Sequence, residues 1–202
     1  MLKIESDYKE NYGDIPLDYH KRLEILIRNL RKKKRKSKID IFEEVKRISN
    51  IEWETYEFIV YLVPKATPRP RVNYSRAIFY VKGSSDNRKL FKSFIKKNPH
   101  PLITTPLYME VCSYLPTPKS LSDEDKILAE MGYIRPISKP DFDNLAKTYA
   151  DMMNGLLIYD DALIIKGTSE KFYSIKPRIE IKLTYMKEFD SLFNRKKIES
   201  KI

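Results

Sequence analysis

The chain has 202 residues, of which 42% are hydrophobic and 12% aromatic, which is enough for a packed core and excludes global disorder. The single cysteine, Cys112, excludes an intramolecular disulfide framework. With one cysteine and only two histidines, a zinc site is not expected. Any metal must therefore be held by oxygen ligands, which suit magnesium, manganese or calcium. The formal net charge of +11 indicates a polyanionic partner, most often nucleic acid, although a basic surface kept for solubility is the alternative.

The N-terminal segment MLKIESDYKENYGD is polar, unlike a signal peptide, and no apolar run approaches the roughly 18 residues of a membrane span. We therefore expect a cytoplasmic protein without a membrane partner.

The N-terminal quarter holds most of the charge, because residues 21–50 carry +8 with 12 Lys or Arg and 4 Asp or Glu. Two apolar stripes at helical spacing predict two short helices there: Leu23, Leu26, Ile27 and Leu30, then Ile41, Val45 and Ile48. The run RKKKRKSK lies between them and contains five predicted DNA-backbone contacts: Arg31, Lys32, Lys33, Lys34 and Arg35. A solvated linker or a localisation signal is the alternative for this run.

The next segments alternate between strand and helix patterns. Strands are predicted at residues 57–64, 77–81 and 107–116, and a helix at residues 86–97. The first two strands are separated by the Pro- and Arg-rich segment ATPRPRV. In the third strand, alternating residues from Leu107 to Ser113 share one face.

The C-terminal half begins with a helix within SLSDEDKILAEMG that Ser122 is expected to cap and Gly132 to end. Two strands, ALIIKGTSEKFYS and RIEIKLTYM, meet at a turn at Lys176-Pro177. The pattern predicts an α+β fold, a mixed β-sheet flanked by helices with a basic helical N-terminal extension. Three parts are expected: the extension at 1–50, the main domain at 51–187 and a charged tail at 188–202.

Residues 139–161, KPDFDNLAKTYADMMNGLLIYDD, gather five aspartates in this basic chain. Asp141 is expected to cap a helix that ends at Asn154-Gly155, and Asp160-Asp161 to begin the following strand. The i, i+4, i+8 spacing of Asp143, Lys147 and Asp151 predicts one charged face of the helix, separate from a less polar face. The helix and strand are expected to lie side by side, so that their carboxylates repel each other, and a divalent cation would relieve that repulsion. Simple caps and turns are the alternative for these acids.

The run from Pro116 to Met186 resembles the RusA family of Holliday-junction endodeoxyribonucleases, in particular the forms of phages and prophages of Gram-positive bacteria. The matching segments keep their order: PTPKSLS, IRPISKPDFDNLAK, DMMNGLLIYDDALI and SEKFYSIKPRIEI. Upstream, VPKATPRPRV resembles the opening of the family after its first strand, so the resemblance covers about residues 56–187.

The resemblance implies a RusA-like nuclease domain that acts as a homodimer and resolves four-way junctions by paired symmetric nicks. It implies Mg²⁺ as cofactor, with Mn²⁺ as a possible substitute. Asp141, Asp143 and Asp161 match the catalytic, metal-binding acids; Asp160 is a further candidate ligand, and Lys147 matches the catalytic lysine. For a phage-encoded protein, the cytoplasm would be that of the bacterial host.

Arg69, Arg71 and Lys171 are predicted DNA contacts, with solvation of a loop as the alternative for the two arginines. One departure from the family is the acidic helix start SDEDK, where relatives are typically basic. The other is the basic extension, which lies outside the resemblance; we hypothesise that it compensates for this loss of positive charge or adds dimer surface.

Two other functions stay open from the sequence. The same nuclease chemistry can act on forks or flaps, or the chain can be a junction-binding protein without catalytic activity. The intact set of acids and lysine argues against the second of these.

Overall fold

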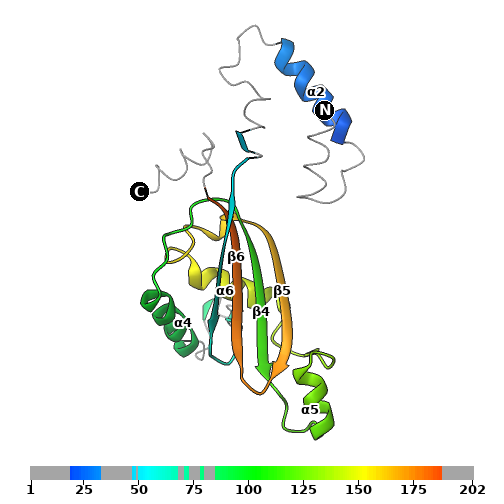
Figure 1. The fold of residues 1–202 in the computed structure, drawn as a ribbon, viewed down its shortest axis with the longest axis vertical. Coiled ribbons are helices and arrows are strands. Elements are labelled where there is room, and N and C mark those ends of the chain that lie inside the picture. Colours follow the sequence, from blue (N-terminus) through cyan, green and yellow to red (C-terminus); the bar gives the residue numbers. More distant parts are fainter. Residues whose placement is uncertain are drawn as a thin grey trace. The chain divides into compact units, whose positions relative to one another are not determined.

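The computed structural model describes residues 19–32, 47–48, 50–67, 71–72, 78–79 and 85–187 (Figure 1). The chain divides into two compact units, Met1–Ile51 and Glu52–Ile202. In the first unit, helix α2 (Tyr19–Lys32) confirms the first predicted helix. The second predicted helix lies largely outside the described residues, as does the charged tail.

The second unit is built on a four-stranded mixed sheet, which confirms the predicted fold class. Its strands are β1 (Trp53–Val60), β4 (Leu107–Pro116), β5 (Ile164–Ser174) and β6 (Arg178–Met186), in the order β1-β6-β4-β5. Strands β4 and β5 run parallel and the other pairs are antiparallel. A parallel pair needs a long crossover, and here the crossover contains helices α5 (Asp123–Glu130) and α6 (Phe142–Met153).

The predicted first strand is displaced along the sequence. β1 begins at Trp53 and ends at Val60, whereas the pattern predicted residues 57–64. Its antiparallel partner β6 explains the difference, because the pairing runs from Trp53 opposite Met186 to Val60 opposite Ile179. The ladder therefore spans the length of β6, and Pro64 lies beyond it.

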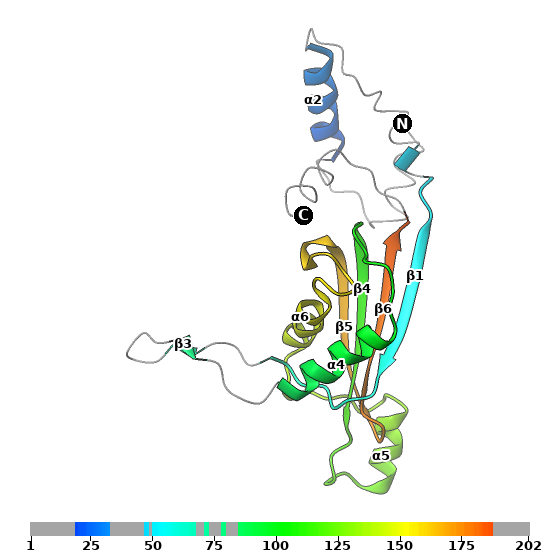
Figure 2. The same ribbon diagram turned by 90° about the vertical axis from the view of Figure 1, so that its left-hand side faces the viewer.

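Helices cover one face of the sheet. Helix α4 (Ser85–Lys97) and helix α6 lie on the same side, and α5 lies beyond the end of the strands (Figure 2). The core between helices and sheet uses the alternating residues of the strands, so that Met109, Val111, Ile181 and Leu183 are buried. The opposite face of the sheet carries the intervening, more polar residues.

The segment between β1 and α4 contains a short antiparallel pair. Strand β2 (Arg71–Val72) pairs with β3 (Ile78–Phe79), so the strand predicted at residues 77–81 is present but only two residues long. Within the described residues, no helix is both long and apolar enough to cross a bilayer. The cytoplasmic location stays a prediction.

Helix α5 has the predicted ends. The Asp125 N–H donates to Ser122 Oγ at 3.1 Å, and Gly132 adopts φ +84° just after the helix. Glu130 then ties the helix to the β5–β6 turn by accepting hydrogen bonds from Ser174 Oγ (2.8 Å) and the Ile175 N–H (2.7 Å).

Substitution of Phe91 tests the packing of α4. Phe91 is fully buried, and its ring centroid lies 5.4 Å from that of Tyr149 in α6. We expect Phe91→Ala to lower the free energy of unfolding by about 3–5 kcal/mol, because it leaves a cavity in the core. Leu90→Ala is the matched control, since Leu90 is 56% exposed, and it should change stability by less than about 0.5 kcal/mol. Equal losses of unfolding free energy in the two variants, measured by urea denaturation, would contradict this packing.

Candidate active site

Helix α6 separates an apolar face from a charged face. Leu145, Thr148, Tyr149 and Met152 are buried against the core. Asp143 and Lys147 are exposed and Asp151 is half-buried; they follow one another at intervals of four residues and therefore lie along one face. The predicted division of this helix into two faces is confirmed.

The first acid, Asp141, occupies the predicted position but does not form the predicted bond. It is the N-cap residue of α6, with φ −68° and ψ 144°, yet its side chain makes no capping hydrogen bond. Its exposed carboxylate lies at the end of the helix where the macrodipole favours negative charge. The prediction of its place is correct, and the prediction of its capping bond is wrong.

Lys147 connects the helix to the second group of acids. Its Nζ lies 3.1 Å from Asp151 Oδ1 and 3.8 Å from Asp161 Oδ2. The hydrogen bond with Asp151 raises the pKa of Lys147, and the nearby charge of Asp161 acts in the same direction. The lysine is therefore a cation at neutral pH, and the predicted adjacency of the helix and the segment before β5 is confirmed.

The Asp160-Asp161 pair has divided roles. Asp160 Oδ1 accepts a hydrogen bond from the Ala162 N–H at 3.0 Å and so caps the 3₁₀-helix η1 (Asp161–Leu163). Asp161 is the first residue of η1, and β5 begins only at Ile164. This short helix presents Asp161 towards Lys147.

Strand β5 holds the segment that leads into α6. Lys171 Nζ donates hydrogen bonds to the backbone carbonyls of Ser138 (2.9 Å) and Pro140 (3.1 Å), and Ser169 Oγ donates to the carbonyl of Phe142 (2.9 Å). The Lys139–Pro140 peptide bond is cis. Lys171 thus supports the position of the first acids. Its predicted contact with DNA stays a prediction.

A second anchor comes from the segment after β1. The Thr67 N–H donates to Thr148 Oγ1 at 2.8 Å, and Asn144 Nδ2 donates to the Thr67 carbonyl at 3.3 Å. Helical spacing places Thr148 on the less polar face of the helix, but sequence reasoning missed its hydrogen bond with Thr67. A hydroxyl among the buried residues of an amphipathic helix needs a hydrogen-bond partner, and this was a usable signal.

The predicted DNA contacts are only partly placed. Arg71 lies in β2, and Arg31 and Lys32 end α2. Arg69 follows Thr67 by two residues and, like Lys33, Lys34 and Arg35, lies outside the described residues.

The arrangement can be tested against the expected metal. Within the described ranges, no group of three or more Asp, Glu, His or Cys side chains is arranged to hold a metal ion. The expected convergence of Asp141, Asp143, Asp160 and Asp161 is therefore not seen as a formed cluster. Like-charged carboxylates repel each other, and here Asp161 faces the ammonium of Lys147 while Asp160 accepts a backbone hydrogen bond. The donor set consists of oxygens only, which fits a hard divalent cation.

Comparisons with known proteins cover the part of the chain that carries this site. Residues 62–184 match the family described as Endodeoxyribonuclease RusA, a range that contains every element of the site. The chain is also 36% identical over 132 residues to the uncharacterized protein YqaN of Bacillus subtilis (strain 168), which covers 62% of this chain and 92% of that protein.

The Thr67 anchor can be tested by Thr148→Val, which keeps the shape of the side chain. We expect it to lower the free energy of unfolding by about 1–3 kcal/mol, because the Thr67 N–H loses its acceptor. The amide of Thr67 should also exchange faster with deuterium. Thr168→Val, at an exposed site on β5, is the control and should change neither quantity. Unchanged exchange at Thr67 in Thr148→Val would refute the anchor.

Proposed function

Because the chain belongs to the RusA family of Holliday-junction endodeoxyribonucleases and therefore hydrolyses phosphodiester bonds in DNA, we propose that it resolves four-way junctions by paired symmetric nicks. The observation that carries the proposal is the 3.8 Å approach of Lys147 Nζ to Asp161 Oδ2. It brings the helix and the Asp160-Asp161 segment of the motif together at one accessible place. A phosphate of DNA can reach this place, since the side chain of Lys147 is 68% exposed.

Asp141, Asp143 and Asp161 would hold a divalent cation, with Asp160 beside them. Carboxylates together with a substrate phosphate are the usual ligands of Mg²⁺, and Mn²⁺ accepts the same oxygen donors. Such an ion supplies polarisation of the scissile phosphate and a lowered pKa for a coordinated water. Asp141, which makes no capping bond, and Asp161, which faces an exchangeable ammonium, can both turn towards a ligand.

Lys147 would place its positive charge on the non-bridging oxygens or on the leaving oxygen of the phosphate. A preorganised cation acts strongly where negative charge develops in the transition state. Its raised pKa keeps it protonated, so it serves as an electrostatic group rather than as a base. Tyr149, two residues further along α6, points into the core, and burial raises the pKa of its hydroxyl.

A homodimer suits this substrate, because a four-way junction with two-fold symmetry is matched by a protein with two-fold symmetry. Each protomer would then cut one of two opposed strands. Forks and flaps are the alternative substrates of the same site. A junction-binding protein without cleavage is the alternative function.

Removal of one carboxylate at a time tests the proposed chemistry. We expect Asp143→Asn and Asp161→Asn each to lower the rate of junction cleavage in Mg²⁺ by more than about 100-fold, the upper range for residues that only support a metal ligand. Binding to the junction in EDTA should persist. Asp123→Asn is the control, since Asp123 pairs with Lys126 on α5 and should leave cleavage unchanged.

Synthetic junctions, forks, flaps and linear duplexes should be compared in the same assay. Paired nicks at symmetric positions of the junction support resolution. Preferential cutting of a fork or flap would show that this structure, and not the four-way junction, is the substrate. Tight binding without nicks in any divalent metal would refute catalysis.

Substitution of the lysine tests its electrostatic role. Lys147→Ala should lower kcat by about 10²- to 10³-fold, as loss of one preorganised charge-stabilising group does, and Lys147→Arg should recover part of the rate. The rate of the parent should show no inflection from this lysine between about pH 6 and 9, because its pKa is raised from an already high value. Lys126→Ala on α5 is the control. An inflection in this range that Lys147→Arg abolishes would instead make Lys147 a proton-transfer group.

A further inference from the structure

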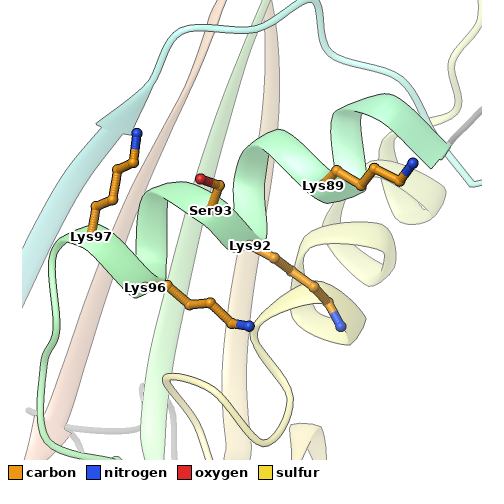
Figure 3. A pocket seen from close by; sticks show the side chains of 5 residues that line it. All are labelled: Lys89, Lys92, Ser93, Lys96 and Lys97. Carbon is orange, nitrogen blue, oxygen red and sulfur yellow. The ribbon is translucent and has the colours of Figure 1, made fainter.

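Helix α4 presents a cationic face to solvent. Its sequence SDNRKLFKSFIKK places Phe91 and Ile95 in the core, while the outer half carries five cations: Arg88, Lys89, Lys92, Lys96 and Lys97. The four lysines surround Ser93 and, with it, line a shallow, open hollow of about 370 Å³. Figure 3 shows Lys92 and Lys96 extending from one side of the helix and Lys97 from the other, with Ser93 between them.

These cations differ in their partners from three cations on the opposite, open face of the sheet. Among the residues that the structure describes, none of the five cations forms an ion pair. On that open sheet face, three cations lie against glutamates: Arg178 Nε is 2.6 Å from Glu180, Arg135 Nη2 is 2.9 Å from Glu170, and Lys182 Nζ is 3.6 Å from Glu110. Lys166, on the same face, lies over the ring of Tyr108 instead. Local acids thus neutralise part of the charge of the sheet face, whereas the charge of α4 is available to an external anion.

Helix α4 packs against α6, the helix that carries the candidate active site. Phe91 of α4 packs on Tyr149 of α6, and Asn87 Nδ2 donates to the Val63 carbonyl at 2.6 Å, in the segment that leads to Thr67. Helices packed in this way have axes about 8–10 Å apart. Both helices cover the same face of the sheet (Figure 2), so a duplex that lies over α6 also passes close to α4.

We propose that the outer face of α4 binds the sugar–phosphate backbone of a duplex arm of the DNA substrate. Lysines are compact point charges on flexible stems, so they suit a row of phosphates and give no sequence preference. The inference rests on the proposed function, because it takes the partner to be the same DNA. It adds a contact surface outside the catalytic helix.

The salt dependence of binding tests this surface. Each phosphate contact contributes about 0.9 to the slope of log K against log salt for B-form DNA. The triple variant Lys89→Gln, Lys92→Gln, Lys96→Gln should reduce the slope by about 2 to 3 units for a linear duplex, measured by fluorescence anisotropy in EDTA. Replacement of the same three lysines by arginine should preserve the slope.

The matched control removes the same charge from the opposite face. Lys166→Gln, Lys176→Gln and Lys182→Gln replace three lysines on the open sheet face and the β5–β6 turn, and should leave the slope unchanged. All six sites are solvent-accessible, and thermal unfolding verifies that both triple variants are folded. A loss of slope equal in both variants would show that net charge alone matters and would overturn the proposal. Parent-like DNA binding by the α4 variant would also overturn it, and would leave an acidic protein as the partner of this face.

Directed cleavage locates the contact independently. The chain has one cysteine, so an iron chelate can be attached to Ser93→Cys in a Cys112→Ser background. Hydroxyl-radical cutting of a junction arm is expected from position 93 and not from Thr168→Cys on the open sheet face. Cutting only from position 168 would refute the proposal.

These readouts separate the inference from the proposed function. Binding in EDTA requires no cleavage, so an α4-dependent slope with no nicks in Mg²⁺ would keep the surface and refute the nuclease proposal. Paired nicks by both the parent and the α4 variant, together with equal slopes of log K against log salt, would support the nuclease proposal and refute the α4 surface. A parent chain that binds no DNA would overturn both.

Discussion

The burial of one face of α6 against the mixed sheet is the constraint on which the candidate site depends. Leu145 and Tyr149 are completely buried, so the rotation of the helix about its axis is fixed by its core contacts. That rotation turns Asp143 and Lys147 outward. A different rotation would bury unpaired charge at a cost far above the gain from any one apolar contact. The burial of the apolar face of α6 thus determines which residues the opposite, charged face presents to solvent.

The connections around α6 then fix its start. The helix lies within the crossover between the parallel strands β4 and β5, and β5 returns past the first turn of the helix. There Lys171 and Ser169 hold the backbone on either side of Asp141, while Thr67 is held from α6 itself. These hydrogen bonds place the acids relative to the sheet more firmly than helix packing alone, because packing leaves freedom to slide along the axis. The residues that support the site therefore come from three separate segments of the chain.

Features that are set by neighbouring residues could be predicted from the sequence, whereas features that depend on residues far apart in the chain could not. Periodicity identified β6 and the faces of α6, and the cap residue and terminal glycine identified α5, since each of these signals is set by nearby residues. The i, i+4 spacing placed Asp143 and Lys147 on one face. The start of β1 was misplaced because its bounds are set by pairing with β6. The bond between Thr148 and Thr67 was missed for the same reason, as its two partners are 81 residues apart. The expectation that the acids form a cluster considered only their positions and charges. It ignored the competing ammonium of Lys147 and the hydrogen bond from the Ala162 N–H to Asp160.

The distribution of charge explains how a basic chain can use an acidic site. At a distance, an approaching DNA duplex responds to the summed positive potential, which decays over about 10 Å at 0.1 M ionic strength. At contact, it meets individual groups, and here the two faces of the domain differ. Glutamates on the open sheet face pair with cations such as Arg178 and Lys182, whereas none of the cations of α4 forms an ion pair within the described residues. The free energy of approach therefore favours the helical face, where Lys147 offsets the charge of Asp151 and Asp161. In the proposed mechanism, a phosphate arriving there would replace a carboxylate as the partner of that ammonium, and the released carboxylate would be available to a divalent cation.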